Sequence, residues 1–155
     1  MFNILSGLQE GSRSVMLSHR TSASVLAKGT VVIGSAANTV VAADGADAAF
    51  NARAISWIFE DTKNQSSGKN TIARGIMECE TDQFTDAATA GGTGTGGTIA
   101  ALDYLMPGTG AYVGKLCKAD SANIAKAVAR CVDRYAIPST VSGTSVTVIK
   151  IETLA

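Results

Sequence analysis

Short runs of apolar and β-branched residues, separated by clusters of glycine and small polar residues, recur along the whole chain. Eight of these runs fit strands, at 15–20, 30–33, 39–42, 54–59, 71–77, 98–102, 111–117 and 145–151. Short strands with turn residues between them are typical of sandwiches and barrels. The pattern therefore predicts a mainly β fold, a β-sandwich or β-barrel with at most one or two short helices.

The last run has the most regular alternation of side chains. Val146, Val148 and Lys150 fall on one face of a strand, and Thr147 and Ile149 fall on the other. We expect a half-buried closing strand that lies inside a sheet.

The segment 120–132 leaves two interpretations open. An acidic or serine cap followed by apolar residues at helical spacing, Ile124, Val128 and Val132, suits an amphipathic helix. However, residues 127–134 resemble residues 71–78, because each contains an aliphatic-Ala-Arg-small-aliphatic core, and two equivalent elements would both be strands. We favour a turn over residues 120–126 followed by a strand. A second, short Ala-rich helix would fit residues 46–54.

Two segments lack a regular pattern. Residues 1–20 are interpreted as a flexible N-terminal arm in which isolated apolar side chains stand among small polar ones, and residues 21–155 as a single β-rich domain, since 155 residues suit one compact unit. Residues 86–98 form a loop rich in glycine and threonine. The apolar residues of the arm that we expect to bind a partner are Phe2, Ile4, Leu5 and Leu8.

Charge and composition exclude several classes of function. Thirteen Lys and Arg balance thirteen Asp and Glu, and only 17% of residues are charged, which disfavours nucleic acid as a partner. A mean hydropathy of +0.20 argues against intrinsic disorder. No apolar stretch approaches the roughly 18 residues of a membrane span, and residues 1–8 lack the features of a signal peptide. We expect a protein that is made in a cytoplasm, has no membrane partner and keeps its three cysteines reduced.

The sequence offers few reactive groups. Residues 92–97 match the spacing GxGxxG but lack the strand before and the helix after that a phosphate site requires. His19 is the only histidine, and neither a catalytic triad nor a zinc site with the scattered cysteines Cys79, Cys117 and Cys131 has support. Trp57 and its apolar neighbours suit a core. We expect no enzyme activity and no cofactor.

Acidic residues at alternate positions mark one predicted strand. Glu78, Glu80 and Asp82 would project from one face, a spacing compatible with calcium or with paired catalytic carboxylates. A solvated or partner-facing strand is the interpretation we favour, and no metal is expected. Basic residues that include Arg130 and Arg134 follow later in the chain. The acidic and basic regions suit either head-to-tail packing between subunits or pairing within one subunit.

The layout of these elements resembles the small capsid decoration, or cement, proteins of tailed bacteriophages. The resemblance covers residues 25–151 and is carried by four phrases: Lys28–Ile33 as a first strand, an Ala-Arg-Gly-Ile run around Gly75, Gly110–Leu116 with its Val-Gly-Lys-Leu, and Val146–Ile151 as an aliphatic terminal strand. Proteins of this family look like β-sandwich or tulip-shaped barrel folds that form trimers, sometimes dimers, on the expanded shell.

The resemblance implies a viral structural protein on the capsid exterior. Its partners would be the major capsid protein and further copies of itself, with a homotrimer favoured, and the arm would lie as an added strand on a capsid sheet. Two other functions remain open. One is a small-molecule-binding or metal-binding β-barrel, with Glu78, Glu80, His19 and the glycine loop around a pocket. The other is a different phage part, such as a tail or baseplate module.

Overall fold

The computed structural model describes residues 2–6, 17–21, 26–36, 39–47, 55–58, 69–87, 97–138 and 143–154. The described part is mainly β, as predicted. Its elements are the strands β1 (Phe2–Ser6), β2 (Leu17–Thr21), β3 (Val31–Ala36), β4 (Thr39–Ala42), β5 (Ile55–Ile58), β6 (Lys69–Ala73), β7 (Glu78–Thr81), β8 (Tyr104–Pro107), β9 (Leu116–Lys118), β10 (Ala129–Pro138) and β11 (Ser145–Thr153), with the 3-10 turns η3 (Gly110–Tyr112) and η4 (Ile124–Lys126).

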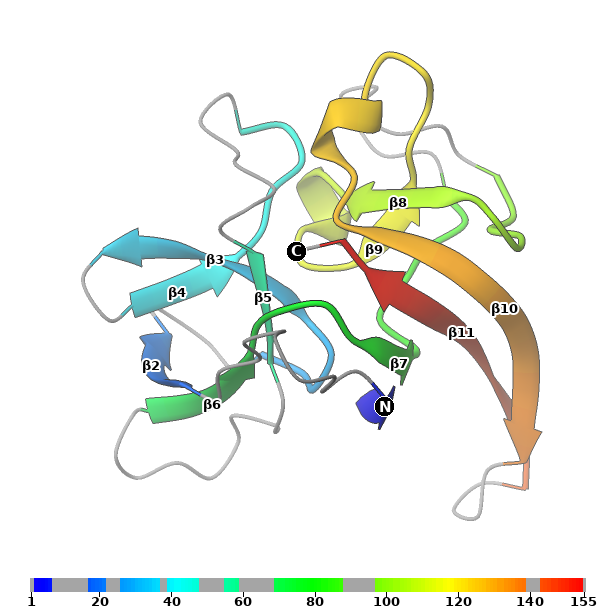
Figure 1. The fold of residues 1–155 in the computed structure, drawn as a ribbon, viewed down its shortest axis with the longest axis horizontal. Coiled ribbons are helices and arrows are strands. Elements are labelled where there is room, and N and C mark those ends of the chain that lie inside the picture. The colour runs from blue at the N-terminus through cyan, green and yellow to red at the C-terminus, as the bar shows by residue number, and fades with distance from the viewer. Residues whose placement is uncertain are drawn as a thin grey trace.

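The strands form two sheets. One has six strands in the order β1-β7-β11-β10-β8-β9, and the other is a closed barrel in the order β2-β4-β3-β5-β6. All pairings are antiparallel except that of β2 with β4. In Figure 1 the barrel lies on the left and the six-stranded sheet on the right, with the long β10–β11 hairpin curving away from the body.

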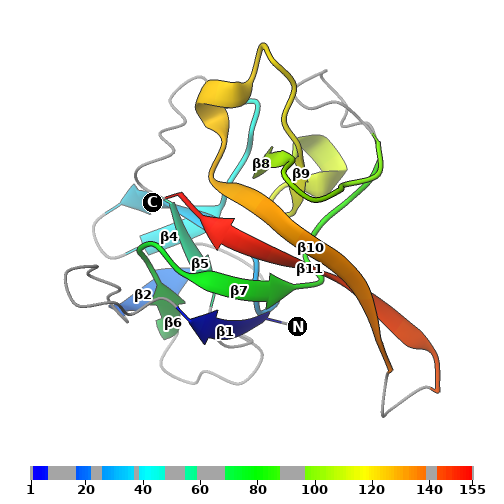
Figure 2. The same cartoon turned by 45° about the vertical axis from the view of Figure 1, so that its right-hand side comes forward.

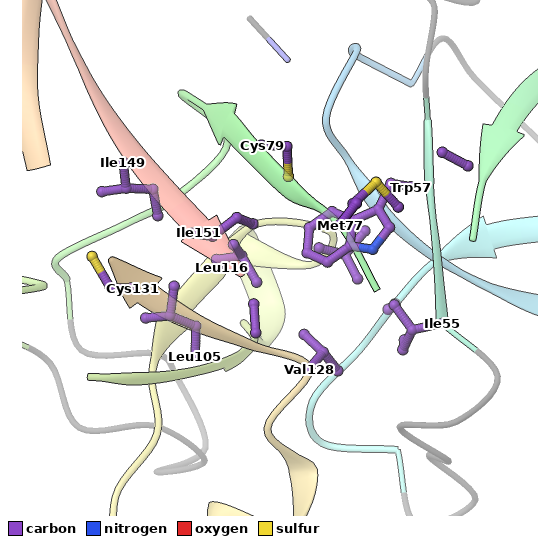
Figure 3. Packing of buried hydrophobic residues seen from close by; sticks show 14 of the residues in the cluster. Ile55, Trp57, Met77, Cys79, Leu105, Leu116, Val128, Cys131, Ile149 and Ile151 are labelled. Atoms are coloured by element: carbon purple, nitrogen blue, oxygen red, sulfur yellow. The ribbon is translucent and has the colours of Figure 1, made fainter. Parts of the chain in front are cut away.

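The two sheets share a core, which confirms the predicted sandwich-like packing. Residues adjacent in sequence are buried on opposite faces of a strand: Trp57 of β5 belongs to the main cluster between the sheets, and Ile58 belongs to the cluster inside the barrel. In Figure 3, Trp57 lies beside Met77, while Ile149 and Ile151 of β11 face the same interior. Strands that are buried on both faces explain why the run around Trp57 has no polar alternation.

Several predicted strands differ in extent from those in the structure. The run 39–42 is a strand with those bounds, and the run 145–151 extends to Thr153. Residues 98–102 are not a strand, because the backbone N–H of Ile99 donates to the Asp86 carboxylate and the chain then turns at Leu102, whose φ is +73°. Residues 111–117 begin in a 3-10 turn and become a strand only at Leu116.

The ambiguous segment 120–132 is resolved in favour of the strand. Residues 120–126 form turns that end in η4, and β10 begins at Ala129. Asp120 does act as a cap, since its carboxylate accepts the Asn123 backbone N–H at 2.9 Å, but it caps a turn. Of the expected helix over 46–54, residues 48–54 lie outside the described part.

The N-terminal segment is partly built into the sheets. Phe2–Ser6 is strand β1 and pairs with β7 of the same chain, and Leu17–Thr21 is strand β2 of the barrel. The expectation of an arm that orders only against another molecule therefore differs from the structure for these two strands. An unpaired edge of β7 is available within the chain, so β1 makes its backbone hydrogen bonds there.

Candidate interaction surface

Among the strands whose burial the structure describes in full, the far half of the β10–β11 hairpin is the most exposed. Strand β10 pairs with β8 only at Ala129 and Arg130, and β11 pairs with β7 only as far as Ile149. Beyond these points the two strands pair with each other, through to Pro138 and Ser145. Figure 2 shows this ribbon projecting past β1 and β7. Most of its residues are exposed, so this far half of the hairpin is a two-stranded ribbon that extends from the six-stranded sheet.

A β-bulge marks the place where the ribbon leaves the sheet. The register shifts between Cys131 and Asp133, so that Val132 and Asp133 together face Lys150 of β11. A bulge bends its strand and increases the local twist. It also returns Arg134 to the core side of the sheet, because Arg134 pairs with the buried Ile149.

Arg134 fixes the base of the ribbon to the body. Its guanidinium donates to both oxygens of the Asp86 carboxylate, at 2.8 and 2.7 Å, and lies 5.1 Å from the centre of the Phe84 ring. Asp86 Oδ1 also accepts the Ile99 backbone N–H at 2.9 Å. Three segments far apart in sequence therefore meet at one carboxylate, which we call the Asp86 clamp (Phe84, Asp86, Ile99 and Arg134).

The clamp shifts the titration of both charged groups. The hydrogen bond from Arg134 holds the pKa of the Asp86 carboxyl below its usual value, and the Ile99 N–H and the nearby positive charge act in the same direction against the opposing effect of burial. The same hydrogen bond raises the pKa of Arg134. Both groups are therefore charged at neutral pH, and the pair is a charge-assisted, two-point contact.

The predicted partner residues Glu78, Glu80 and Arg130 lie on the outer face of the six-stranded sheet, where they have partners in the same chain. Lys150 forms an ion pair with Glu78, and Arg130 pairs with Glu152 at 2.8 Å. Glu80 accepts a hydrogen bond from the Tyr135 hydroxyl.

The acidic and basic regions thus meet within one subunit at several points. Asp86 pairs with Arg134 and Asp103 pairs with Lys118, at 2.7 and 2.8 Å. Asp82, the third of the alternating acidic residues, accepts a hydrogen bond from Gln83 at 2.9 Å. Of the two interpretations of the charge pattern, pairing within a subunit describes these contacts.

The predicted N-terminal partner residues fall in and after β1. Phe2 lies opposite Thr81 and Ile4 lies opposite Cys79 in the β1–β7 register, and Leu5 is 45% exposed. Leu8 lies outside the described residues. As candidates for partner binding these four residues stay a prediction.

The described segments contain no cluster of metal ligands. No set of three or more His, Cys, Asp or Glu residues there is placed to hold a metal ion. His19 lies in β2 opposite Asn70, in the other sheet from Glu78 and Glu80. Burial is the main cause that raises the thiol pKa values, to about 12 for Cys79 and about 11 for Cys117 and Cys131.

Apolar side chains pack inside the barrel. Val32, Val40, Ile58 and Ile72 form one apolar cluster, and Leu26 packs against it. A barrel of about eight strands is just wide enough to be filled by its own side chains, so a five-stranded barrel leaves little room for a ligand. In the described part of the chain, no helix has the length and apolar character to cross a bilayer.

Sequence reasoning missed two residues that shape this surface. By its sequence Asp86 belongs to the loop 86–98 rich in glycine and threonine, and nothing in its neighbours indicates that it joins Ile99 to Arg134. Leu102 ends the predicted strand 98–102, but in the structure it is 71% exposed in a turn next to β10, where its N–H donates to the Cys131 carbonyl at 2.8 Å. The Leu-Asp pair at a turn was the available signal, since aspartate favours turns.

Comparison of the chain with models of known protein families, with curated proteins and with solved structures gave no match.

Proposed function

We propose that this protein is a structural component of a tailed-bacteriophage virion, a decoration protein that binds the outer surface of the major capsid protein shell as a homo-oligomer, with a trimer favoured. The observation that carries the proposal is the β10–β11 ribbon. It projects from the body, is held at its base by the Asp86 clamp, and ends in residues 143–147 that carry no charged side chain. An isolated two-stranded ribbon is marginally stable in water, so it gains by being covered.

Other exposed apolar side chains support a protein that works by contact. Leu102, Ile76 and Leu5 are 71%, 54% and 45% exposed, so each offers apolar area that a partner would remove from water. Burial at an interface contributes about 25 cal/mol per Å² before the cost of association is subtracted. On a shell that binds many copies, a small net gain at each contact adds up to resistance against internal pressure.

We propose the capsid as the partner because the layout of the predicted elements resembles that of decoration proteins. The projecting ribbon and the β1 strand at the sheet edge are compatible with that role, and the apolar cluster inside the barrel gives a small-molecule site little support. A tail or baseplate module would use the same kinds of surface, and localisation in the virion separates the two.

Co-sedimentation with shells tests the proposal. Expanded empty shells of the virus that encodes the chain should carry the protein into the pellet in a saturable manner and should break at a higher temperature when it is bound. A variant with Leu102→Ser serves to probe the exposed apolar side chain, and Ser121→Ala, also at an exposed position, is its control. Failure of the unaltered protein to bind expanded shells would remove the proposal.

A further inference from the structure

The direction of the backbone groups along β11 follows from its neighbours. Cys131 of β10 directs both its backbone groups to the β8 side, since its N–H donates to Asp103 and its carbonyl accepts from Leu102. Its partner Ile151 therefore directs its own groups away from β10, toward β7. Thr153 obeys the same rule, because its N–H donates to the Met77 carbonyl at 2.9 Å. The odd-numbered residues of β11 thus point their backbone groups to the β7 side.

Beyond Ile149 this side of β11 is open. Thr81 of β7 pairs with Ile149, and β7 ends there. The backbone groups of Thr147 and Ser145 consequently face the space past the end of β7, with no partner among the described residues. Both residues are exposed, and Val146 between them is 38% exposed. Figure 2 shows β11 continuing along the ribbon well past the end of β7.

The opposite edge of the ribbon is blocked. On β10 the bulge interrupts the strand at Val132 and Asp133, and the Arg134 N–H is taken by the Asp133 carboxylate at 2.7 Å. Pro138, at the end of β10, has no N–H to donate. Bulges, charges and prolines are the devices by which proteins prevent strand addition at an edge. The β11 edge at 145–147 carries none of them.

We propose that a second copy of this chain occupies the open β11 edge, pairing antiparallel about a two-fold axis that passes beside Val146. Ser145 of each copy then lies opposite Thr147 of the other, and these two residues have the backbone groups that face outward. Two hydrogen-bonded pairs flank one pair without hydrogen bonds, Val146 against Val146, as an antiparallel ladder requires. The two ribbons become one four-stranded sheet.

The chemistry of the edge favours a second copy over an unrelated strand. A two-fold contact needs a patch that complements itself. Residues 143–149 contain no charged side chain, so no side chain there would face the same charge on the second copy. The Val146 pair joins two Ile137–Val146 cross-strand pairs into one apolar row, because Ile137 lies opposite Val146 in the β10–β11 register. This pairing does not rest on the proposed capsid function, since it forms a dimer or joins copies of two larger oligomers.

Cysteine cross-linking tests the axis directly. In a pair without hydrogen bonds, Cα atoms about 4.5 Å apart are within disulfide range, so Val146→Cys should cross-link two chains under mild oxidation. Ser145→Cys is the matched control, because the same geometry places its two copies about 8 Å apart, beyond that range. The expected cross-linking rate is about tenfold higher for Val146→Cys. Equal rates would overturn the proposal.

A second variant tests the backbone pairing. Thr147→Pro removes an N–H that points to the open edge, so it leaves the β10–β11 hydrogen bonds in place. In sedimentation velocity the unaltered chain should reach at least twice the 15.8 kDa of one chain, and Thr147→Pro should lose that association while its circular dichroism is retained. A chain that stays monomeric at every concentration, or a proline variant that associates equally well, contradicts the two-fold pairing. A strictly monomeric chain would also contradict the homo-oligomer of the proposed function, whereas shell binding itself is tested separately by co-sedimentation.

Discussion

Replacement of Arg134 by methionine should destabilise the protein well beyond the effect of an ordinary surface ion pair. Methionine keeps the apolar stem but removes the two hydrogen bonds to Asp86 and the contact with the Phe84 ring. Hydrogen bonds to charged groups contribute about 1.5–3 kcal/mol, and a partly exposed cation–π contact about 0.5–1 kcal/mol. The Arg134 and Asp86 side chains are 25% and 34% exposed, so solvent screening lowers the sum, and we expect a loss of about 2 kcal/mol.

The same strand supplies the control for this prediction. Arg130 pairs with Glu152 through a single 2.8 Å contact, and these side chains are 41% and 43% exposed. Arg130→Met should therefore change the free energy of unfolding by no more than about 0.5 kcal/mol. Urea titration gives both values, and calorimetry should show Tm falling by roughly 4–8 °C for Arg134→Met. Equal losses in the two variants would refute the reasoning that the clamp holds the base of the ribbon.

Three further outcomes are expected from the structure. The stabilisation from the clamp is present above the ordinary carboxyl pKa of 3.8 and is lost as the pH falls through the lower pKa that Asp86 has in the folded protein. The free energies of unfolding of Asp86→Asn and of the unaltered protein, measured by acid titration, should therefore converge below pH 3.8. Gly45→Ala should lower the free energy of unfolding by more than about 1 kcal/mol, since the new Cβ would lie 2.2 Å from the Pro107 carbonyl oxygen. Gly34→Ala, whose Cβ would have nothing within 4 Å, should change it by no more than about 1 kcal/mol. Urea titration measures both values, and equal losses would show that the 43–47 turn moves aside freely. The buried thiols should react with a thiol reagent only after denaturation, and fast labelling of the native protein would contradict their burial at Cys79, Cys117 and Cys131.

Local patterns were sufficient to predict the class of fold and several strands. The alternation around Val146 predicts a half-buried closing strand, and β11 has that character from Ile149 on, where buried and half-buried residues alternate; Val148, which falls on the same face as Val146, is buried as well. The similarity of residues 127–134 to residues 71–78 favours a strand, and β10 is a strand, but the two segments are not equivalent, because β6 ends at Ala73 and β7 begins only at Glu78. These features are decided by side-chain periodicity within one element, which a sequence displays directly.

The features that depend on distant contacts could not be predicted in this way. Ile99 looks like a strand residue, but the Asp86 carboxylate takes its N–H and the chain turns instead. The sequence likewise did not show that β1 would pair with β7, or that Arg134 would return inward, since a bulge two residues earlier changes the face of every later residue. Each outcome depends on a partner in another element, from 13 residues away for Asp86 and Ile99 to more than 70 for β1 and β7, so the periodicity within one element does not contain it.

If a tailed bacteriophage encodes this chain, as we propose, electron microscopy of its virions shows whether the chain binds the capsid. We expect additional density on the outside of the capsid that fits the two-sheet body with its projecting β10–β11 ribbon, and that is absent from particles lacking the protein. Capsids that look identical with and without the protein, or density confined to the tail, would contradict the claim that this chain acts by binding the shell.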